Sequence, residues 1–296
     1  MTRSAILFAN LRAGRSRLFA QAIEALSNVG VDIHAAHFDL GADAVRGAVS
    51  RAAASGVNLV LVFGGDGTIG SVVDAIVGQD VTLGVIAAGT SNNFARSLGI
   101  KPGIPGSVSA ITAGREVDID VGSVNGRYFA HGAIMGLNVD FARAAQRYRG
   151  FLGRLSYPLA SLLVYKSRRR LSLTIEVGAE ELMVETYQLA VLNSGIFGGP
   201  LEVTVDGAHV ATGTLRVVTV DDLRLRTVVR ELPHIFFERH LGLPGGYSFD
   251  LVDGEVTAPT PVDITLDGEI KCQTPARIRV VPRALRVLAQ PAEMPS

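Results

Sequence analysis

The N-terminal third of the chain alternates two kinds of hydrophobic pattern. Short runs of consecutive apolar residues predict buried strands, whereas apolar residues that recur every three or four positions predict helices. Their alternation is typical of βαβ units, which build a parallel sheet covered by helices. Strands are expected at residues 5–9, 31–38, 59–63 and 83–87, and helices at residues 18–26, 42–54, 69–77 and 92–98.

The pattern changes after a Pro- and Gly-rich segment at residues 101–106 and a last short helix that is expected to end near Gly114. The rest of the chain is rich in Val, Thr and Ile and is divided by Gly, Asp and Pro, which predicts strands joined by turns. One helical stretch at about residues 149–165 interrupts this half. Strands are expected at residues 171–177, 185–192, 214–220, 262–266 and 276–281.

The change in pattern predicts two domains. We expect an α/β domain with a parallel, Rossmann-like sheet over residues 1–118 and a β-rich domain over residues 119–283, with the boundary near residues 116–120. A chain of 296 residues is long enough for two domains, and 48% hydrophobic against 19% charged residues predicts a sizeable buried core.

Charge and cysteine content exclude several classes of function. The 28 Lys and Arg residues balance the 28 Asp and Glu residues, so no net charge attracts nucleic acid. The single cysteine, Cys272, excludes an intrachain disulfide and a cysteine-based zinc site, and it suits a reducing, cytoplasmic environment. No apolar run approaches the ~20 residues of a transmembrane segment, so none is expected.

The strongest chemical signal is the turn Gly64-Gly65-Asp66-Gly67-Thr68, which follows a predicted strand and precedes a predicted helix. Glycines let the backbone approach a phosphate closely, and the N–H groups and the positive end of the helix attract the anion. The carboxylate of Asp66 makes sense among these donors if a Mg²⁺ ion bridges it to phosphates. The alternative is an ordinary connecting turn, because Gly and Asp are common turn residues.

A second turn, Gly89-Thr90-Ser91-Asn92-Asn93, occupies the same place in the next strand–helix unit. Its hydroxyl and amide side chains can cap the helix, bind a nucleotide, or do both. Neighbouring strand ends are where open α/β sheets bind ligands, which favours nucleotide binding.

A third signal is Asp267-Gly268-Glu269, two carboxylates that follow a predicted strand. Either carboxylate can remove a proton from a hydroxyl group that accepts a phosphoryl group. The alternative is a simple hairpin turn. The six histidines show no zinc-binding spacing, and Ser194 lacks the Gly-x-Ser-x-Gly motif of serine hydrolases.

An apolar helical stretch at residues 151–170 ends in Lys166-Ser167-Arg168-Arg169-Arg170. Such a segment can dock an enzyme on anionic lipid. It can equally be a core helix whose basic end complements the helix dipole.

These motifs together resemble the bacterial lipid kinase family that shares the diacylglycerol kinase catalytic domain. The resemblance covers nearly the whole chain, and the ordered set is far more specific than any one motif, since the glycine-rich turn is shared with NAD kinases and phosphofructokinases. The landmarks in order are Asn10, residues 64–68, residues 89–99, residues 153–157, Asn193 with Gly198 and Gly199, and residues 266–269.

The resemblance implies an NAD kinase-like and phosphofructokinase-like α/β domain that binds ATP, followed by a β-sandwich, with the active site in the cleft between them and residues 284–296 returning to the first domain. By position, Glu269 or Asp267 would be the base, and Asp66 would hold Mg²⁺ and contribute to catalysis. The implied ATP-binding residues are Asn10, Gly64, Gly65, Asp66, Gly67, Thr68, Ile69, Gly70, Gly89, Thr90, Ser91, Asn92 and Asn93.

The sequence departs from the family pattern at several positions. Gly70-Ser71 stands where Asn or His followed by Glu is usual, and Asn93 stands where Asp is common. Leu11 replaces a typical proline. The loop of a structural Mg²⁺ site reads Thr212-Gly213, without the usual aspartate, so a second metal site is left open.

The sequence is therefore compatible with three functions. The favoured one is an ATP-dependent lipid kinase that uses Mg²⁺ and phosphorylates a hydroxyl of diacylglycerol or a related lipid. The alternatives are a small-molecule kinase of the NAD kinase type and a catalytically weak nucleotide-binding regulator. The resemblance implies a cytoplasmic protein that meets its lipid at the inner membrane surface, and it leaves the formation of a homodimer open.

Overall fold

The computed structural model describes residues 3–11, 16–137, 139, 169–197, 203–222, 224 and 246–290. Three features expected from the sequence lie outside these residues. They are the landmark at residues 153–157, the glycine pair at 198–199, and the apolar stretch that precedes Arg169 and Arg170. Among the helices of the described residues, none combines the length and the apolar character that crossing a bilayer demands.

The N-terminal half contains a parallel sheet in the order β2-β1-β3-β4. Every residue of β3 and β4 is buried, because helices cover both faces of the sheet. This double burial explains why these strands read as continuous apolar runs. The strands are β1 (Arg3–Ala9), β2 (Val31–His37), β3 (Leu59–Gly64) and β4 (Thr82–Ala87).

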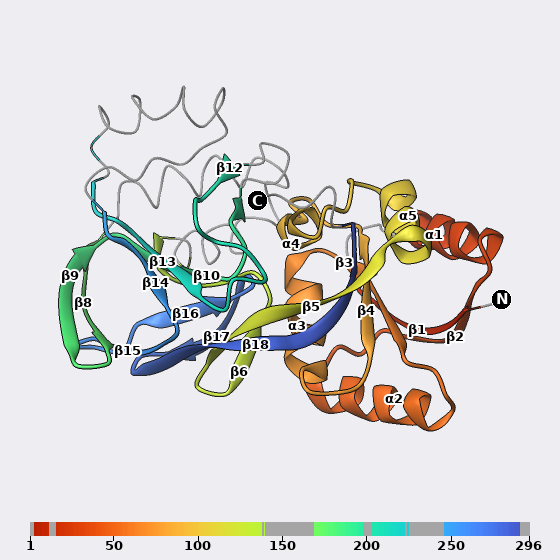
Figure 1. Cartoon of the computed structure of the whole chain (residues 1–296), viewed down its shortest axis with the longest axis horizontal. Coiled ribbons are helices and arrows are strands. Elements are labelled where there is room, and N and C mark those ends of the chain that lie inside the picture. Colours follow the sequence, from red (N-terminus) through yellow and green to blue (C-terminus); the bar gives the residue numbers. More distant parts are fainter. Residues whose placement is uncertain are drawn as a thin grey trace, which may run out of the picture.

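Two pairs of helices cover the sheet (Figure 1). Helices α1 (Ser16–Asn28) and α5 (Ile104–Ala113) pack on one face, and α2 (Ala42–Ala54) and α3 (Asp66–Ile76) pack on the other. A short helix, α4 (Asn93–Ser97), follows β4. Helix α3 begins three residues before the predicted start at residue 69. Gly65 therefore directly precedes the helix, and Gly67 lies inside it.

Two long strands, β5 (Arg115–Val124) and β18 (Ala276–Ala289), run side by side across both halves of the molecule (Figure 1). β18 pairs antiparallel with β5 and parallel with β4, where Arg286 faces Thr82. The strand predicted at residues 276–281 was therefore too short. Residues 116–120, where the sequence changes pattern, lie inside β5.

The described part of the second half is built from two large sheets and a small two-stranded one, in which β11 pairs with β12. Strands β15, β8 and β9 extend the first sheet beyond β18, and a separate antiparallel sheet has the order β14-β13-β10-β7-β16-β17. The bounds are β6 (Arg127–Phe129), β7 (Gly132–Gly136), β8 (Leu171–Val177), β9 (Glu180–Thr186), β10 (Gln188–Leu192), β11 (Ile196–Phe197), β12 (Val203–Thr204), β13 (Leu215–Val220), β14 (Ser248–Leu251), β15 (Asp253–Thr257), β16 (Asp263–Leu266) and β17 (Glu269–Gln273).

The sequence predicted one strand at residues 185–192, but the structure has a break there. β9 ends at Thr186 and β10 begins at Gln188, and the two strands belong to different sheets. The Thr186 hydroxyl stabilises the break, since it accepts a hydrogen bond from the N–H of Val220 at 3.2 Å and donates to the carbonyl of Gln188 at 2.8 Å. A local hydroxyl contact of this kind does not disturb the alternating pattern, so the sequence did not reveal it.

The two large sheets of the second half enclose their own core. Met135, Leu189 and Ile264 come from one sheet, and Val124 and Ile278 come from the other, and all five are buried in one apolar cluster. This arrangement is the β-sandwich that the resemblance implied. Because β5 and β18 belong to this sandwich and also border the parallel sheet, the turns that follow β3, β4 and β16 are held in one framework.

Candidate active site

Two glycine-rich turns meet at the carboxyl ends of β3 and β4. These are the 64–68 turn and the 89–93 turn, which the sequence predicted to lie together. A Cβ atom built on Gly65 would lie 3.0 Å from the Cα of Gly89, and one built on Gly89 would lie 2.5 Å from the Cα of Gly65. The two backbones therefore touch at a place where only glycine fits.

Asp66 links the two turns through its side chain. It is the first residue of α3, and its Oδ1 accepts a hydrogen bond of 3.0 Å from the N–H of Phe94 in the first turn of α4. A carboxylate is stabilised at the positive end of a helix, and here it lies beside two such ends. Its second oxygen, Oδ2, has no partner among the described residues and is available to a ligand.

The other residues predicted in the 64–68 turn have distinct environments. Thr68 is buried, and its Oγ1 lies 3.5 Å from the Nδ2 of Asn10, at the end of β1. Ile69 is fully buried in the core, and its backbone N–H already donates to the carbonyl of Gly65 at 3.0 Å, so its part is to pack the turn against the core. A Cβ atom on Gly64 would lie 2.5 Å from the Cβ of Thr68, so the turn needs glycine there as well.

Asn92 holds the 89–93 turn closed. Its backbone is left-handed, with a φ of 51°, and its side chain both accepts a hydrogen bond from the N–H of Gly89 at 2.8 Å and donates one to the carbonyl of Gly89 at 3.1 Å. The amide of Asn92 is thus used within the turn. Thr90 is exposed and Ser91 and Asn93 are half-buried, so these three side chains border the open side of the turn.

Asp267 anchors the turn between β16 and β17. Its φ is 50°, its side chain is buried, and its carboxylate accepts hydrogen bonds from the backbone N–H groups of Ala130 at 2.9 Å, His131 at 2.8 Å and Gly132 at 3.0 Å. Burial raises the pKa of Asp267, and the three N–H donors oppose that rise because they stabilise the charged form. Both oxygens of this carboxylate accept hydrogen bonds from backbone N–H groups.

Gly70 lets this anchor reach helix α3. A Cβ atom on Gly70 would lie 2.5 Å from Oδ2 of Asp267 and 2.6 Å from its Cβ. The glycine that departs from the family pattern therefore has a packing role, because it leaves room for the buried carboxylate.

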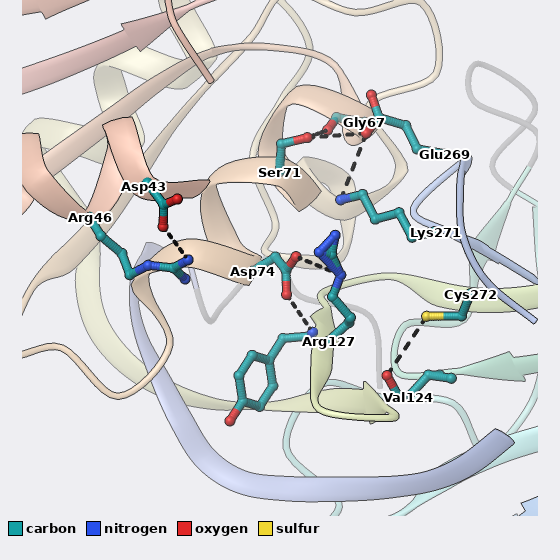
Figure 2. Close-up of polar contacts among 11 residues, drawn as sticks. Asp43, Arg46, Gly67, Ser71, Asp74, Val124, Arg127, Glu269, Lys271 and Cys272 are labelled. Atoms are coloured by element: carbon teal, nitrogen blue, oxygen red, sulfur yellow. Dashed lines mark hydrogen bonds and ion pairs between the residues drawn. The ribbon is translucent and has the colours of Figure 1, made fainter. Parts of the chain in front are cut away.

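Glu269 lies over the first turn of α3, as Figure 2 shows. Its side chain is 53% exposed, and its Oε2 accepts a hydrogen bond of 3.2 Å from the Ser71 hydroxyl and lies 3.7 Å from the Nζ of Lys271. A Cβ atom on Gly67 would lie 3.6 Å from the other carboxylate oxygen, Oε1. The structure thus brings Glu269 of the sandwich beside the 64–68 turn of the parallel sheet, across 198 residues of sequence from Ser71.

His131 and Ser194 form a buried polar group next to the Asp267 anchor. Nδ1 of His131 lies 3.3 Å from Oγ of Ser194, and both residues are buried. Burial lowers the pKa of His131, and the nearby carboxylates of Asp66 and Asp267 act in the opposite direction. Neither residue was expected in the site from the sequence, because an isolated histidine and an isolated serine have no motif.

Asn193, one of the family landmarks, fixes the position of this group. Its Nδ2 donates to the carbonyl oxygens of Asp120 at 2.8 Å and Ala130 at 2.9 Å. Its buried Oδ1 has no hydrogen-bond partner among the described residues. The side chain therefore joins β5 to the strand that leads to His131.

A pocket of about 350 Å³ opens between α4 and the β11–β12 region. Its lining combines polar side chains, among them Ser194, Asp206 and His209, with apolar ones, among them Ile196 and Val210. Since Ser194 lies on its wall and contacts His131, the pocket adjoins the group behind the candidate active site.

The described residues contain no cluster of three or more His, Cys, Asp or Glu side chains that could hold a metal ion. A cation at Asp66 would therefore take most of its ligands from water and from a bound phosphate, which suits Mg²⁺. At the loop of the second metal site, which the sequence left open, the two carboxylate oxygens of Asp120 accept hydrogen bonds from the backbone N–H groups of Gly213 at 2.6 Å and Arg283 at 2.9 Å. The Thr212 hydroxyl is within 3.1 Å of the carbonyls of His209 and Thr214.

Comparison with known proteins yields two family matches that together span most of the chain. Residues 4–124 match the diacylglycerol kinase catalytic domain. Residues 132–289 match the YegS C-terminal NAD kinase beta sandwich-like domain.

Individual relatives agree with these matches. A protein of Mycobacterium tuberculosis named diacylglycerol kinase is 30% identical over 280 residues, covering 92% of this chain and 87% of that protein. A protein of Klebsiella pneumoniae named "Probable lipid kinase YegS-like" is 28% identical, covering 97% and 96%. A crystal structure of a diacylglycerol kinase from Bacillus anthracis has the same fold, with a TM-score of 0.72, 18% identity and coverage of 98% of both chains.

Proposed function

Because the chain belongs to the bacterial lipid kinase family that carries the diacylglycerol kinase catalytic domain, we propose that it transfers the γ-phosphate of ATP to a hydroxyl of diacylglycerol or a closely related lipid. Membership of the family makes the chain an ATP-dependent phosphotransferase with a lipid acceptor. The proposal goes further in naming the lipid and in assigning a role to each residue of the site.

The phosphates of ATP are bound by backbone groups in this proposal. The 64–68 turn offers N–H groups at the amino end of α3, a helix that continues to Ile76 and therefore adds its dipole. The 89–93 turn closes the other side, where Thr90, Ser91 and Asn93 can bond the nucleotide. Asn10, beside Thr68, completes the binding set.

Mg²⁺ would be held by Asp66 together with the phosphates. Oδ1 is fixed by its bond to Phe94, and this leaves Oδ2 for the ion, in keeping with the small number of protein carboxylates that Mg²⁺ normally requires. When bound, the ion neutralises charge on the phosphates. The protein's own part is to hold Oδ2 at one place beside the turn.

Glu269 is the proposed base and Asp267 is its support. The hydroxyl that attacks the γ-phosphate must lose a proton, and a base has to lie within hydrogen-bonding reach of it. The Glu269 carboxylate is exposed and faces the 64–68 turn, whereas the Asp267 carboxylate is buried among three backbone donors. The position of Glu269 over the 64–68 turn is the single observation that carries this assignment.

The experiment combines purified protein with ATP and a lipid panel. We expect phosphate transfer to diacylglycerol or a related lipid, and we expect Glu269→Gln to lower kcat by about 10²–10⁴ while the affinity for ATP stays unchanged. Glu255→Gln, at an exposed position of β15, is the matched control. Mass spectrometry of lipids from cells that overproduce the protein identifies the product.

Other results would decide for the alternatives. Transfer to NAD or another small molecule, with none to lipid, would assign a small-molecule kinase. Tight ATP binding without transfer to any acceptor would assign a nucleotide-binding regulator. Full activity of Glu269→Gln would refute the role of this residue as the base.

The site of action follows from the two substrates. ATP is supplied by the cytoplasm and the lipid by a membrane, so we place the protein in the cytoplasm with peripheral contact to the inner membrane surface. Cosedimentation with lipid vesicles tests this contact, and analytical ultracentrifugation tests whether a homodimer forms.

A further inference from the structure

The Glu269 carboxylate is held by one hydrogen bond and one ion pair that no sequence motif marks. The Ser71 hydroxyl, one turn along α3 from Gly67, lies 3.2 Å from Oε2 of Glu269. The ammonium group of Lys271 lies 3.7 Å from the same oxygen, and the Lys271 side chain is only 13% exposed. Figure 2 shows both groups directed at the carboxylate.

The two oxygens of this carboxylate are not equivalent. Oε2 has both contacts, while Oε1 has no hydrogen-bond partner among the described residues and would lie 3.6 Å from a Cβ atom built on Gly67. A carboxylate oxygen that accepts a hydrogen bond and faces a cation accepts a further proton less readily than an oxygen without such contacts. Oε1 therefore remains for a hydroxyl group that approaches the 64–68 turn.

Lys271 owes its place to an irregularity in the strand. β16 and β17 pair as Leu266 with Glu269 and Thr265 with Ile270, and then Ile264 pairs with Cys272, so the register passes over Lys271. An extra residue of this kind is a β-bulge, which re-aims side chains and is frequent beside active sites. The bulge and the ion pair are independent observations, and both concern the same side chain.

We infer that Ser71 and Lys271 are positioning residues, which hold Oε2 of Glu269 and so present Oε1 to the acceptor hydroxyl. This inference rests on the proposed function of Glu269 as the base. In the reaction, the acceptor oxygen forms the new bond to the γ-phosphorus, the bond from that phosphorus to the ADP oxygen breaks, and the hydroxyl proton passes to Oε1.

Ser71 can act in this way because its side chain is short and uncharged. A carboxylate at position 71 would repel Glu269, whereas the serine hydroxyl can donate to it. The serine hydroxyl has a single proton and two acceptors in reach, Oε2 of Glu269 and the carbonyl of Gly67 at 3.0 Å. A charged acceptor forms the stronger bond, so the ionised carboxylate receives it.

The test measures kcat and KM in three variants. Lys271→Met is expected to lower kcat by roughly 10- to 100-fold with little change in the KM for ATP, since a small misplacement of a reacting group has an effect of this size. Lys271→Arg keeps the cation and is expected to recover most of the loss. Arg127→Met is the matched control, because Arg127 also forms an ion pair of 3.7 Å, with Asp74, but does not contact Glu269.

A double-mutant cycle separates positioning from a general structural effect. If Lys271 acts through Glu269, adding Lys271→Met to Glu269→Gln should produce no further loss of kcat. Ser71→Ala should behave in the same way, with Ser71→Thr as the variant that keeps the hydroxyl. Losses that simply multiply in the double variants would overturn the inference, as would a wild-type kcat in Lys271→Met.

Crystal structures of the variants separate this inference from the proposed function. If Lys271→Met moves the Glu269 carboxylate away from Gly67, the positioning role stands even if the wild-type protein phosphorylates no lipid. If the wild-type protein is an active lipid kinase and the carboxylate and kcat of Lys271→Met are unchanged, the positioning inference alone is refuted.

Discussion

Two carboxylates that are separated by a single glycine have opposite environments. Asp267 points inward and ties the backbone of residues 130–132 to the turn, while Glu269 points outward over α3. From the sequence alone either one could be the base, because Asp-Gly-Glu says nothing of which side chain faces the cleft. The positive φ of Asp267 turns its side chain inward, and only the three-dimensional structure reveals this.

Gly70→Ala should destabilise the protein although alanine favours helices. The added methyl group would meet the buried Asp267 carboxylate at 2.5 Å, and such overpacking costs about 1–3 kcal/mol. Urea unfolding measures the change. Gly47→Ala in α2 is the control, since its new methyl group would meet only the flexible end of Arg51, and we expect it to raise stability by roughly 0.5–1 kcal/mol. Equal effects of the two substitutions would contradict this account.

His131 should make stability depend on pH. Burial lowers its pKa below the ordinary value of 6.5, so at mildly acid pH the unfolded chain binds a proton that the folded chain does not. The free energy of unfolding should therefore fall as the pH drops through 6.5, by up to about 1.4 kcal/mol per pH unit from this group. His131→Asn should lose less stability than the wild-type protein between pH 7.5 and pH 5.5 in urea unfolding. Equal losses would show that His131 is not the group responsible.

Among the elements, the buried parallel strands were the most predictable. β3 was expected at residues 59–63, and the structure has it at Leu59–Gly64. The prediction was accurate because both faces of the strand are buried, so its sequence is apolar throughout. β18 was expected to end at residue 281, since Pro282 follows. The chain instead passes Pro282 with a register shift between Val281 and Leu285, with Arg283 at a φ of 49°, and then resumes pairing.

The candidate site was predictable only where a motif and a strand end coincide. The 64–68 and 89–93 turns met this condition, and the structure places them in contact. The contacts of Ser71 and Lys271 with Glu269 did not meet this condition. Ser71 is far from Glu269 in sequence, and Lys271 is brought to it by the shift in register of β17. Serine on the partly exposed face of a helix and lysine on an edge strand are ordinary residue types, so no pattern distinguishes them.

Gly65→Val should abolish ATP binding and leave the protein folded. The valine Cβ would lie 3.0 Å from the Cα of Gly89, and its methyl groups would fill the space between the two turns. The turns would separate, and the N–H groups could no longer converge on one phosphate. Calorimetry should detect no ATP binding, and circular dichroism should match the wild-type spectrum. Unchanged affinity would remove the 64–68 turn from the proposed nucleotide site.

The whole molecule is joined by two strands that belong to both halves. β5 and β18 pair with each other from Arg115 with Ala289 to Val124 with Ile278, and they cross from the parallel sheet into the sandwich (Figure 1). Their residues contribute to the cores of both halves. The two parts of the candidate active site therefore lie on one continuous framework.

This framework predicts that the two halves unfold together. Calorimetry of the wild-type protein should show a single heat-absorption peak, because neither core can lose β18 and stay intact. Val287→Ala, at a fully buried position of β18 beside β4 and β5, should shift the whole peak to lower temperature. Two separate peaks, of which the substitution shifts only one, would show that the halves are independent.

The place of β18 in the chain has a consequence for synthesis on the ribosome. The edge of β4 pairs with residues 286–287, so the parallel sheet leaves the ribosome with that edge unpaired while about two hundred further residues are translated. Nascent chains of this length expose a strand edge that can pair wrongly. Chaperones that shield nascent chains should therefore matter more for the yield of this enzyme than its final stability would suggest.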